Sequence, residues 1–339
     1  MSGNHRKWLR DTLAGRPWAR VPYNFMFSPP AEQRLKEHYG ADNVLAALDL
    51  PMALVGPADK PLYANPEVYG ETITDQFRVV WSTNAIDRGS PVGPPLREPS
   101  LAGYEFPDPD DPARFAHLAE QVERLQDRFI IGVVGDLWER ATFMRGMEAL
   151  CLDVRLHRGF VGDLLEGICE YNLRTFEHLA ELPIDGIFIS DDYGTQRGLV
   201  IGRRDWRELV RPRLARIYDA AKARGLVVMH HTCGCVVELV PDLIEMGLDI
   251  LHPIQPEAMD IFALKRQFGS DLTFCGGIGT QELLPHATPE QVRAEVLRTL
   301  EAMAQGGRYI LEPGITLQAD VPTENMVAMI EAVREYRLF

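Results

Sequence analysis

Several features that mark other classes of protein are missing from this sequence of 339 residues. No apolar run approaches the roughly 20 residues that a membrane-spanning helix needs. The N-terminal stretch MSGNHRKWLRDTLAGRPW is basic but lacks the apolar core of a secretory signal. The five cysteines are odd in number, which argues against a disulfide framework. We therefore expect a cytoplasmic protein whose reduced thiols are free to act as ligands or nucleophiles.

The common phosphate-binding and nucleophile motifs are absent too. No G-x-G-x-x-G follows a candidate strand, and there is neither a Walker sequence nor a G-x-S-x-G elbow. The formal net charge of −14 argues against nucleic acid, because its phosphates require clustered lysine and arginine. The same charge disfavours an anionic membrane surface. Small molecules are therefore the expected ligands.

Short apolar runs alternate with amphipathic segments along most of the chain. Such runs are typical of strands that are buried on both faces of a parallel sheet. The candidate strands are residues 21–27, 52–56, 129–134, 186–190, 226–233, 249–255, 272–278 and 308–314. Eight strands with helices between them predict an α/β fold, a (β/α)8 TIM barrel formed as a single domain over residues 1–339, and a doubly wound sheet is the alternative.

Two of the intervening segments carry clear helix signals. In residues 111–126, Asp111 is a candidate N-cap with Pro112 at the first helical position. In residues 288–307, Thr288 and Gln291 have the spacing of a capping box, and Gly306 is the expected end of the helix. Residues 57–113 differ from both, because they are rich in Pro, Gly and Asp. We interpret them as an inserted hairpin and loop over one face of the barrel, where they would cap its mouth, and the residues before the first strand as an N-terminal extension.

Barrel enzymes carry their functional groups at the carboxyl ends of the strands and in the loops that follow. Polar side chains occur at these positions in strand after strand. They are Asn24, Asp191, Asp192, Tyr193, Gln196, His231, Cys233, Gln255, Glu257, Cys275 and Glu312. The barrel prediction therefore brings a set of possible ligands and proton donors together at one mouth.

His231 and Cys233 form the sharpest of these patterns. Residues two apart on a strand point to the same side, so an imidazole and a thiolate would converge there. Zinc binds such nitrogen and sulfur donors, and its further ligands would come from neighbouring strands. The candidates for those ligands are Gln255, Glu257, Cys275 and Glu312. The alternative is a packed cysteine and a histidine bonded to the backbone.

The stretch SDDYGTQRG follows the fourth candidate strand. Adjacent carboxylates at a barrel mouth can share a proton, orient a base or bind a cation, so we predict that Asp191 or Asp192 is catalytic. Tyr193 is the third candidate catalytic residue, and both Tyr193 and Gln196 are candidate donors to a polar substrate. The alternative is an acidic helix N-terminus, with one carboxylate acting as its cap.

The remaining candidates concern the walls of the pocket. Glu312 lies on an otherwise apolar run, so its carboxylate must be paired, metal-bound or protonated. Asn24 and Gln255 are expected to contact the substrate. Phe27 and Trp81 are candidate apolar walls, with packing in the core as the alternative for each.

Four stretches of the chain resemble the uroporphyrinogen decarboxylase superfamily. They are residues 135–154, 231–260, 272–285 and 309–332, and they follow in register. The resemblance implies a distorted (β/α)8 barrel with its active site at the carboxyl-terminal mouth. Members are often dimeric, so a homodimer is one possible assembly.

The superfamily has two functional branches. Its haem-pathway decarboxylases use no cofactor and hold a porphyrinogen through an N-terminal segment of the type RQAGRY. The corresponding segment here reads RVPYNFMFSPP and lacks the arginine pair that carboxylate-rich substrates require. The other branch, the corrinoid-linked methyltransferases, carries zinc on an H-x-C motif, which His231-Thr232-Cys233 matches. Ile315 stands where that branch has a later cysteine.

The resemblance implies a zinc-dependent methyltransferase that moves a methyl group between a small substrate and a corrinoid on a separate partner protein. Zinc would lower the pKa of the substrate thiol or alkoxide. One alternative is a metal-free decarboxylase that acts on a carboxylated small molecule. The other is a barrel that binds a small molecule without catalysis.

Overall fold

One curled parallel sheet forms the centre of the molecule. The computed structural model describes residues 5–61 and 63–339. Within them, seven strands are arranged in the order β1-β5-β6-β9-β10-β11-β12. Their bounds are Met52–Val55 (β1), Phe129–Gly135 (β5), Gly186–Ser190 (β6), Val227–His231 (β9), Ile250–Ile254 (β10), Thr273–Ile278 (β11) and Tyr309–Pro313 (β12).

The eighth position of the barrel is filled differently from the prediction. Residues 21–27 are extended but form no strand, and they make only isolated parallel bridges, Tyr23 to Leu311 and Phe27 to Leu317. Pro22 has no N–H, so it can only accept a bond, from the Leu311 N–H at 2.9 Å. The barrel prediction is therefore confirmed, but the prediction of a first strand is wrong because pairing here is intermittent.

Alternate residues of each strand face opposite sides of the sheet, as the period of two requires. The inward-facing side chains form a separate apolar cluster inside the barrel, which Leu9 also joins. Its strand members are Met52, Phe129, Ile131, Phe188, Met229, Ile250, Cys275 and Ile310. Beyond Met229, Ile250 and Ile310, the next inward positions towards the carboxyl ends are His231, His252 and Glu312. The barrel interior therefore becomes polar at its mouth.

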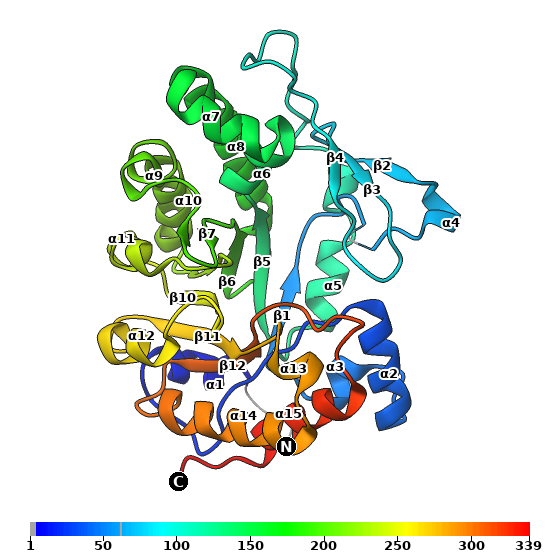
Figure 1. Ribbon diagram of the computed structural model, residues 1–339, viewed down its shortest axis with the longest axis vertical. Coiled ribbons are helices and arrows are strands. Elements are labelled where there is room, and N and C mark those ends of the chain that lie inside the picture. The colour runs from blue at the N-terminus through cyan, green and yellow to red at the C-terminus, as the bar shows by residue number, and fades with distance from the viewer. Residues whose placement is uncertain (1–4, 62) are drawn as a thin grey trace.

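Helices cover the outer face of the sheet (Figure 1). The longer ones are His5–Leu13 (α1), Pro29–Tyr39 (α2), Trp138–Arg145 (α6), Met147–Leu156 (α7), Arg158–Leu179 (α8), Arg211–Ala223 (α10), Ile261–Phe268 (α12), Pro289–Met303 (α14) and Thr323–Glu335 (α15). The shorter ones are Val44–Ala47 (α3), Pro66–Tyr69 (α4), Leu118–Arg124 (α5), Arg203–Leu209 (α9), Val240–Glu245 (α11) and Leu283–His286 (α13), with 3-10 turns at Pro112–Arg114 and Val237–Leu239.

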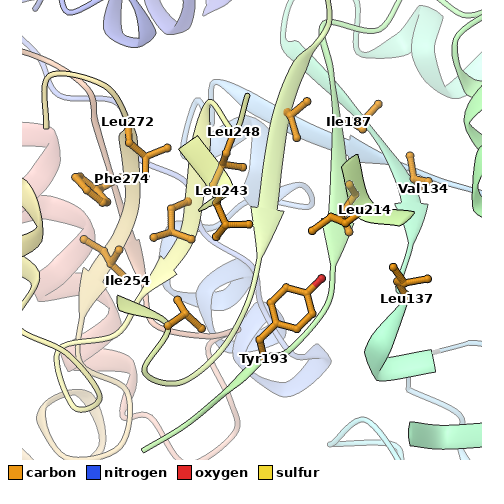
Figure 2. Close-up of a cluster of buried hydrophobic side chains, with 14 of the residues drawn as sticks. Val134, Leu137, Ile187, Tyr193, Leu214, Leu243, Leu248, Ile254, Leu272 and Phe274 are labelled. Atoms are coloured by element: carbon orange, nitrogen blue, oxygen red, sulfur yellow. The ribbon is translucent and has the colours of Figure 1, made fainter. Parts of the chain in front are cut away.

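The layer between sheet and helices is the main hydrophobic core. Figure 2 shows Ile187 of β6 and Phe274 of β11 in this layer with Leu214 of α10 and Leu243 of α11. All four side chains are fully buried. Burying such side chains stabilises the fold by about 1.5–3 kcal/mol each. This packing fixes the outer side of each strand and so sets which side chains face the interior.

The two predicted helix starts have different outcomes. The capping box is confirmed: the Thr288 side chain accepts from the Gln291 N–H at 3.4 Å, and the Gln291 side chain accepts from the Thr288 N–H at 2.9 Å. Helix α14 ends at Met303, before Gly306. At the other site Asp111 does cap, accepting from the Ala113 N–H, but only a 3-10 turn follows before α5. The predicted single helix is therefore divided in two.

The segment 57–113 carries a small antiparallel sheet. Its strands are Thr72–Thr74 (β2), Val80–Ser82 (β3) and Pro91–Gly93 (β4), so the predicted hairpin gains a third strand. The segment lies beside α6 and α8 (Figure 1). Arg140 of α6 forms an ion pair with the buried Asp75 at 2.8 Å, which anchors the small sheet to the barrel. Among the described helices, none is long and apolar enough to cross a membrane.

We predict that Thr288→Ala lowers the free energy of unfolding by about 1 kcal/mol, because an N-terminal N–H of α14 loses its acceptor. Thr288→Ser is the matched control, since its hydroxyl keeps the cap. Urea unfolding of the two variants measures the difference. Equal unfolding midpoints for alanine and serine would show that the cap contributes nothing.

Candidate metal centre

Three donor atoms converge at the mouth of the barrel, from the ends of β6 and β9. We call Asp192, His231 and Cys233 the outer triad; their donor atoms all lie within 4.8 Å of one another. His231 Nε2 lies 3.4 Å from Cys233 Sγ and 3.5 Å from Asp192 Oδ1. The Asp192 side chain is 34% exposed and that of His231 is 14% exposed. The outer triad is therefore reachable from solvent.

Two loops in close contact hold the outer triad together. Strand β9 ends at His231, so Cys233 lies in the loop beyond it. The Cys233 N–H donates to Asp192 Oδ1 at 2.7 Å, and the Gly194 N–H donates to the Cys233 carbonyl at 3.1 Å. A Cβ on Gly234 would lie 2.4 Å from the Gly194 carbonyl carbon, and Gly234 also has a φ of +79°. Only glycine allows this approach.

A second group of donors lies deeper in the barrel. We call His252, Cys275 and Glu312 the inner triad; their donor atoms also lie within 4.8 Å of one another, and all three residues are buried. The Cys275 thiol donates to Glu312 Oε2 at 3.1 Å, and the Asn24 amide donates to Glu312 Oε1 at 3.2 Å. His252 Nε2 lies 3.6 Å from Glu312 Oε2.

The two triads meet at a pair of imidazoles. His231 and His252 are register partners on the neighbouring parallel strands β9 and β10. Their Nδ1 atoms lie 3.0 Å apart, which is a hydrogen-bond distance. Phe188 lies against both rings from the inner face of β6. A continuous line of polar groups therefore runs from Asp192 to Glu312.

Burial dominates the protonation of these groups. It lowers the pKa of both imidazoles below the usual histidine range, so both rings are neutral at neutral pH. Burial also raises the pKa of the Cys233 thiol, an effect that Asp192 and Glu139 strengthen and Arg88 opposes. The pKa of Glu312 rises to about 7 through burial, against the hydrogen bonds from Cys275 and Asn24.

Asp191 and Tyr193 flank Asp192 in the loop after β6, but their side chains bond to each other and do not join the outer triad. Asp191 is fully buried and accepts from the Trp138 and Glu139 N–H groups at 3.0 and 2.6 Å, so it caps the start of α6. The Tyr193 hydroxyl donates to the same carboxylate at 2.6 Å and is also buried. Burial raises the pKa of Asp191 to about 7, with these three hydrogen bonds opposing. Of the predicted catalytic trio, only Asp192 joins the outer triad.

The other predicted contacts are spread around the mouth. Gln255 accepts from the Gly234 N–H at 2.6 Å and donates to the Gly314 carbonyl, so it supports the loop that carries Cys233. Gln196 bonds to Gln281 at 3.0 Å on the surface. Glu257 accepts from the Gln281 N–H at 3.1 Å and belongs to neither triad.

The two predicted apolar walls lie elsewhere. Trp81 is buried in the small antiparallel sheet, where its indole N–H donates to Asp75 and its ring contacts Phe143. Phe27 packs against Phe25 in the segment beside β12. Both positions correspond to the packing alternative rather than to a wall beside the triads.

Three residues near the triads were not predicted. His252 is the most important, and its signal was available: it is the inward residue of β10 opposite His231. Glu139, at the start of α6, has its pKa raised well above the usual value by burial, with Asp192 next in effect. Arg88, on the loop between β3 and β4, is a positive charge whose field reaches both His231 and Cys233. The latter two depend on tertiary contacts that no local pattern reports.

Comparison with known proteins places this architecture in a family. Residues 85–336 match the family described as uroporphyrinogen decarboxylase. The chain is 22% identical over 263 residues to the methylated-thiol–coenzyme M methyltransferase of Methanosarcina mazei, covering 74% of this chain and 67% of that protein. It is 24% identical over 265 residues to the uroporphyrinogen decarboxylase of Methylococcus capsulatus, covering 72% of each.

A solved structure described as a methyltransferase from Methanosarcina mazei is similar over nearly the whole chain. The two superpose with a TM-score of 0.74 at 18% identity, covering 98% of each chain. At this identity the similarity concerns the fold. The match includes the barrel and the small sheet region, since so little of either chain is left out.

We predict that Gly234→Ala destabilises the protein by about 1–3 kcal/mol more than Gly225→Ala does. Gly225 is the matched control, because its φ is +70° but nothing lies within 4 Å of an added Cβ. Both variants bear the backbone strain, and only Gly234→Ala pushes the two loops apart. Thermal or urea unfolding measures the difference, and equal destabilisation would refute the close packing of the loops.

Proposed function

Since the chain belongs to the uroporphyrinogen decarboxylase family, we propose that it is a zinc-dependent methyltransferase that moves a methyl group between a small thiol and a corrinoid on a partner protein. The observation that carries this proposal is the convergence of Asp192, His231 and Cys233 at the open end of the barrel. A catalytic zinc site needs protein donors on one side and an open position on the other. The outer triad offers both.

The donor set fits a zinc ion by its spacing as well as its chemistry. Ligands on a tetrahedral zinc ion, at about 2.0–2.3 Å from the metal, lie roughly 3.3–3.7 Å from one another. The separations of His231 Nε2 from Cys233 Sγ and Asp192 Oδ1 are 3.4 and 3.5 Å. Cys233 must lose its proton on binding, which removes the buried neutral thiol. Asp192 takes the place of the third ligand that Ile315 cannot supply.

The reaction that this site suits is transfer to or from sulfur. When bound, zinc would lower the pKa of a substrate thiol. In the direction of thioether formation, the thiol sulfur forms a bond to the methyl carbon. The corrinoid of the partner protein would supply the methyl group and keep the electron pair of its cobalt–carbon bond, and the thiol proton would pass to solvent. One relative is named a methylated-thiol–coenzyme M methyltransferase, so thiols are the first substrates to test.

The chain's own residues position this chemistry. Gln255 and the Gly194–Gly234 contact hold Cys233 over the mouth. Arg88 contributes positive potential at the outer triad, which partly offsets the negative charges of Asp192 and Glu139. The segment 57–113 is anchored to α6 through the ion pair between Asp75 and Arg140, and we expect it to limit solvent access on that side.

The alternative of a metal-free decarboxylase has less support. Porphyrinogen substrates carry several carboxylates and need cationic partners. In the segment where such arginines would lie, Arg20 is placed with its guanidinium 5.4 Å from the Trp8 ring, where α1 packs. Because uroporphyrinogen decarboxylases are among the relatives, the assay below also tests for decarboxylation.

We expect the purified protein to contain about one zinc ion per chain, and Cys233→Ser to lose it, because a serine hydroxyl is a poor zinc ligand. Cys235→Ser is the matched control, two residues away and outside the outer triad. Elemental analysis after dialysis measures the metal. Equal zinc in Cys233→Ser and the wild type, or none in either, would contradict the proposed site.

We expect the zinc-loaded protein to demethylate free methylcobalamin in the presence of a thiol, and both chelation and Cys233→Ser to reduce the rate at least tenfold. The cobalt absorption spectrum follows the reaction, with a panel of simple and anionic thiols as acceptors. Carbon dioxide release from carboxylated substrates is measured in parallel. Carbon dioxide release without methyl transfer would favour the decarboxylase instead.

A further inference from the structure

The hydrogen bond between the two imidazoles restricts where their protons lie. A histidine that binds a metal must be neutral, and a pair of neutral rings carries two N–H protons in total. One of them occupies the 3.0 Å contact between the Nδ1 atoms of His231 and His252. The other must lie on Nε2 of one ring. Only the other ring then has an Nε2 lone pair. At any one time, therefore, only one of the two triads contains an imidazole nitrogen that can bind a metal.

The two possible arrangements differ in their consequences for His252. In the first arrangement, His252 Nδ1–H donates the hydrogen bond to His231 Nδ1. The His252 Nε2 lone pair then faces the Glu312 carboxylate, and His231 Nε2 carries a proton that points towards the outer triad. In the second arrangement, His231 Nδ1–H donates the hydrogen bond to His252 Nδ1. His252 Nε2–H then points at Glu312, and His231 Nε2 has a free lone pair. The second arrangement pairs a donor with an acceptor at the buried end and leaves a ligand atom at the open end.

His252 Nε2 is buried and has no hydrogen-bond partner among the described residues. Glu312 Oε2 lies 3.6 Å away, about 0.5 Å longer than a normal hydrogen bond. Glu312 already accepts from Cys275 and Asn24. The histidine N–H would be a third donor to this carboxylate, and it would satisfy the one ring nitrogen that is left over.

We propose that His252 and Glu312 are positioning residues that hold His231 in the tautomer with a free Nε2, so that it can bind the metal of the outer triad. This inference rests on the proposed function. The line of contacts runs from His231 Nδ1–H to His252 Nδ1 and from His252 Nε2–H to Glu312 Oε2. Histidines that bind a metal usually donate their other N–H to a carboxylate or carbonyl, and here a second imidazole extends that link.

The inner triad then has a structural purpose without a metal of its own. While His231 is a ligand, His252 Nε2 carries a proton and cannot bind a second cation. Cys275 stays a thiol that donates to Glu312, and burial, with the nearby Glu312 adding to it, raises the pKa of that thiol well above its usual value. The chain should hold one metal ion, although it has two groups of suitable residues.

The test measures zinc affinity by competition with a chromophoric chelator. We expect Glu312→Gln and His252→Phe to weaken zinc binding about 10- to 100-fold while the stoichiometry stays at one, because loss of such a partner has this effect. His230→Gln is the matched control: His230 is the neighbouring buried histidine, but it faces outward and bonds to Tyr218. Its zinc affinity should be unchanged. The absorption spectrum of the Co²⁺ form should shift only in the first two variants.

Cys275→Ser separates this proposal from a metal in the inner triad. Its hydroxyl keeps a donor to Glu312, so we expect zinc binding within about threefold of the wild type. Loss of the metal in Cys275→Ser, two metal ions in the wild type, or unchanged affinity in Glu312→Gln and His252→Phe would each overturn the proposal. In the last case the wild type still binds zinc, so the proposed function would survive.

A measurement without metal completes the test. With ¹⁵N-labelled histidine, the ring nitrogen shifts of the metal-free protein report which nitrogen carries each proton, and His252→Phe assigns the signal. We expect the His252 proton on Nε2 and the His231 proton on Nδ1. The reverse placement of the protons would overturn the proposed line of contacts from His231 to Glu312. A wild type that binds no metal in any preparation would overturn both this line of contacts and the proposed function.

Discussion

Parallel strands that end at the same edge of a curled sheet bring their inward side chains to one place, and the candidate site depends on this. His231, His252 and Glu312 occupy inward positions at the mouth on β9, β10 and β12, directly above the apolar interior. The outward neighbours of these residues are held in the core beneath the helices. Core packing therefore fixes the rotation of each strand, and the polar groups are fixed with it.

The loops add what the strands cannot provide. A buried carboxylate and a neutral imidazole are stable in the interior only when their polar atoms find partners. Within the barrel these partners come from Asn24, Cys275 and the second imidazole. At the mouth they come from backbone N–H groups, such as that of Cys233 to Asp192. The line of groups therefore runs from a fully buried end at Glu312 to a solvent-accessible end at Asp192.

The sequence predicted the architecture well because apolar runs and helix signals are local. Seven of the eight candidate strands exist within the described residues, and the capping box at Thr288 is as predicted. It predicted the proximity of His231 and Cys233, but for an incomplete reason. Strand β9 ends at His231, so Cys233 is placed by the contact between two loops rather than by strand alternation.

The remaining errors have the same origin in non-local geometry. His252 becomes part of the site only through its register with His231 on the neighbouring strand. Nothing in the local sequence decides which of Asp191 and Asp192 caps α6 and which faces the mouth, because both follow the same strand. The segment 21–27 has the composition of a strand, but Pro22 removes a donor and its pairing stays intermittent.

The intermittent pairing of residues 21–27 makes one seam of the barrel weaker than the others. Neighbouring strands elsewhere in the described sheet are joined by three or more paired residues, whereas this seam has two isolated bridges, backbone hydrogen bonds to Leu311 and Leu317, and the bond from the Tyr23 hydroxyl to the Leu48 carbonyl. Local opening costs least where the ladder is thinnest. Asn24 lies on the seam and bonds to Glu312, so a fluctuation that parts the seam would first be felt at the innermost carboxylate of the barrel.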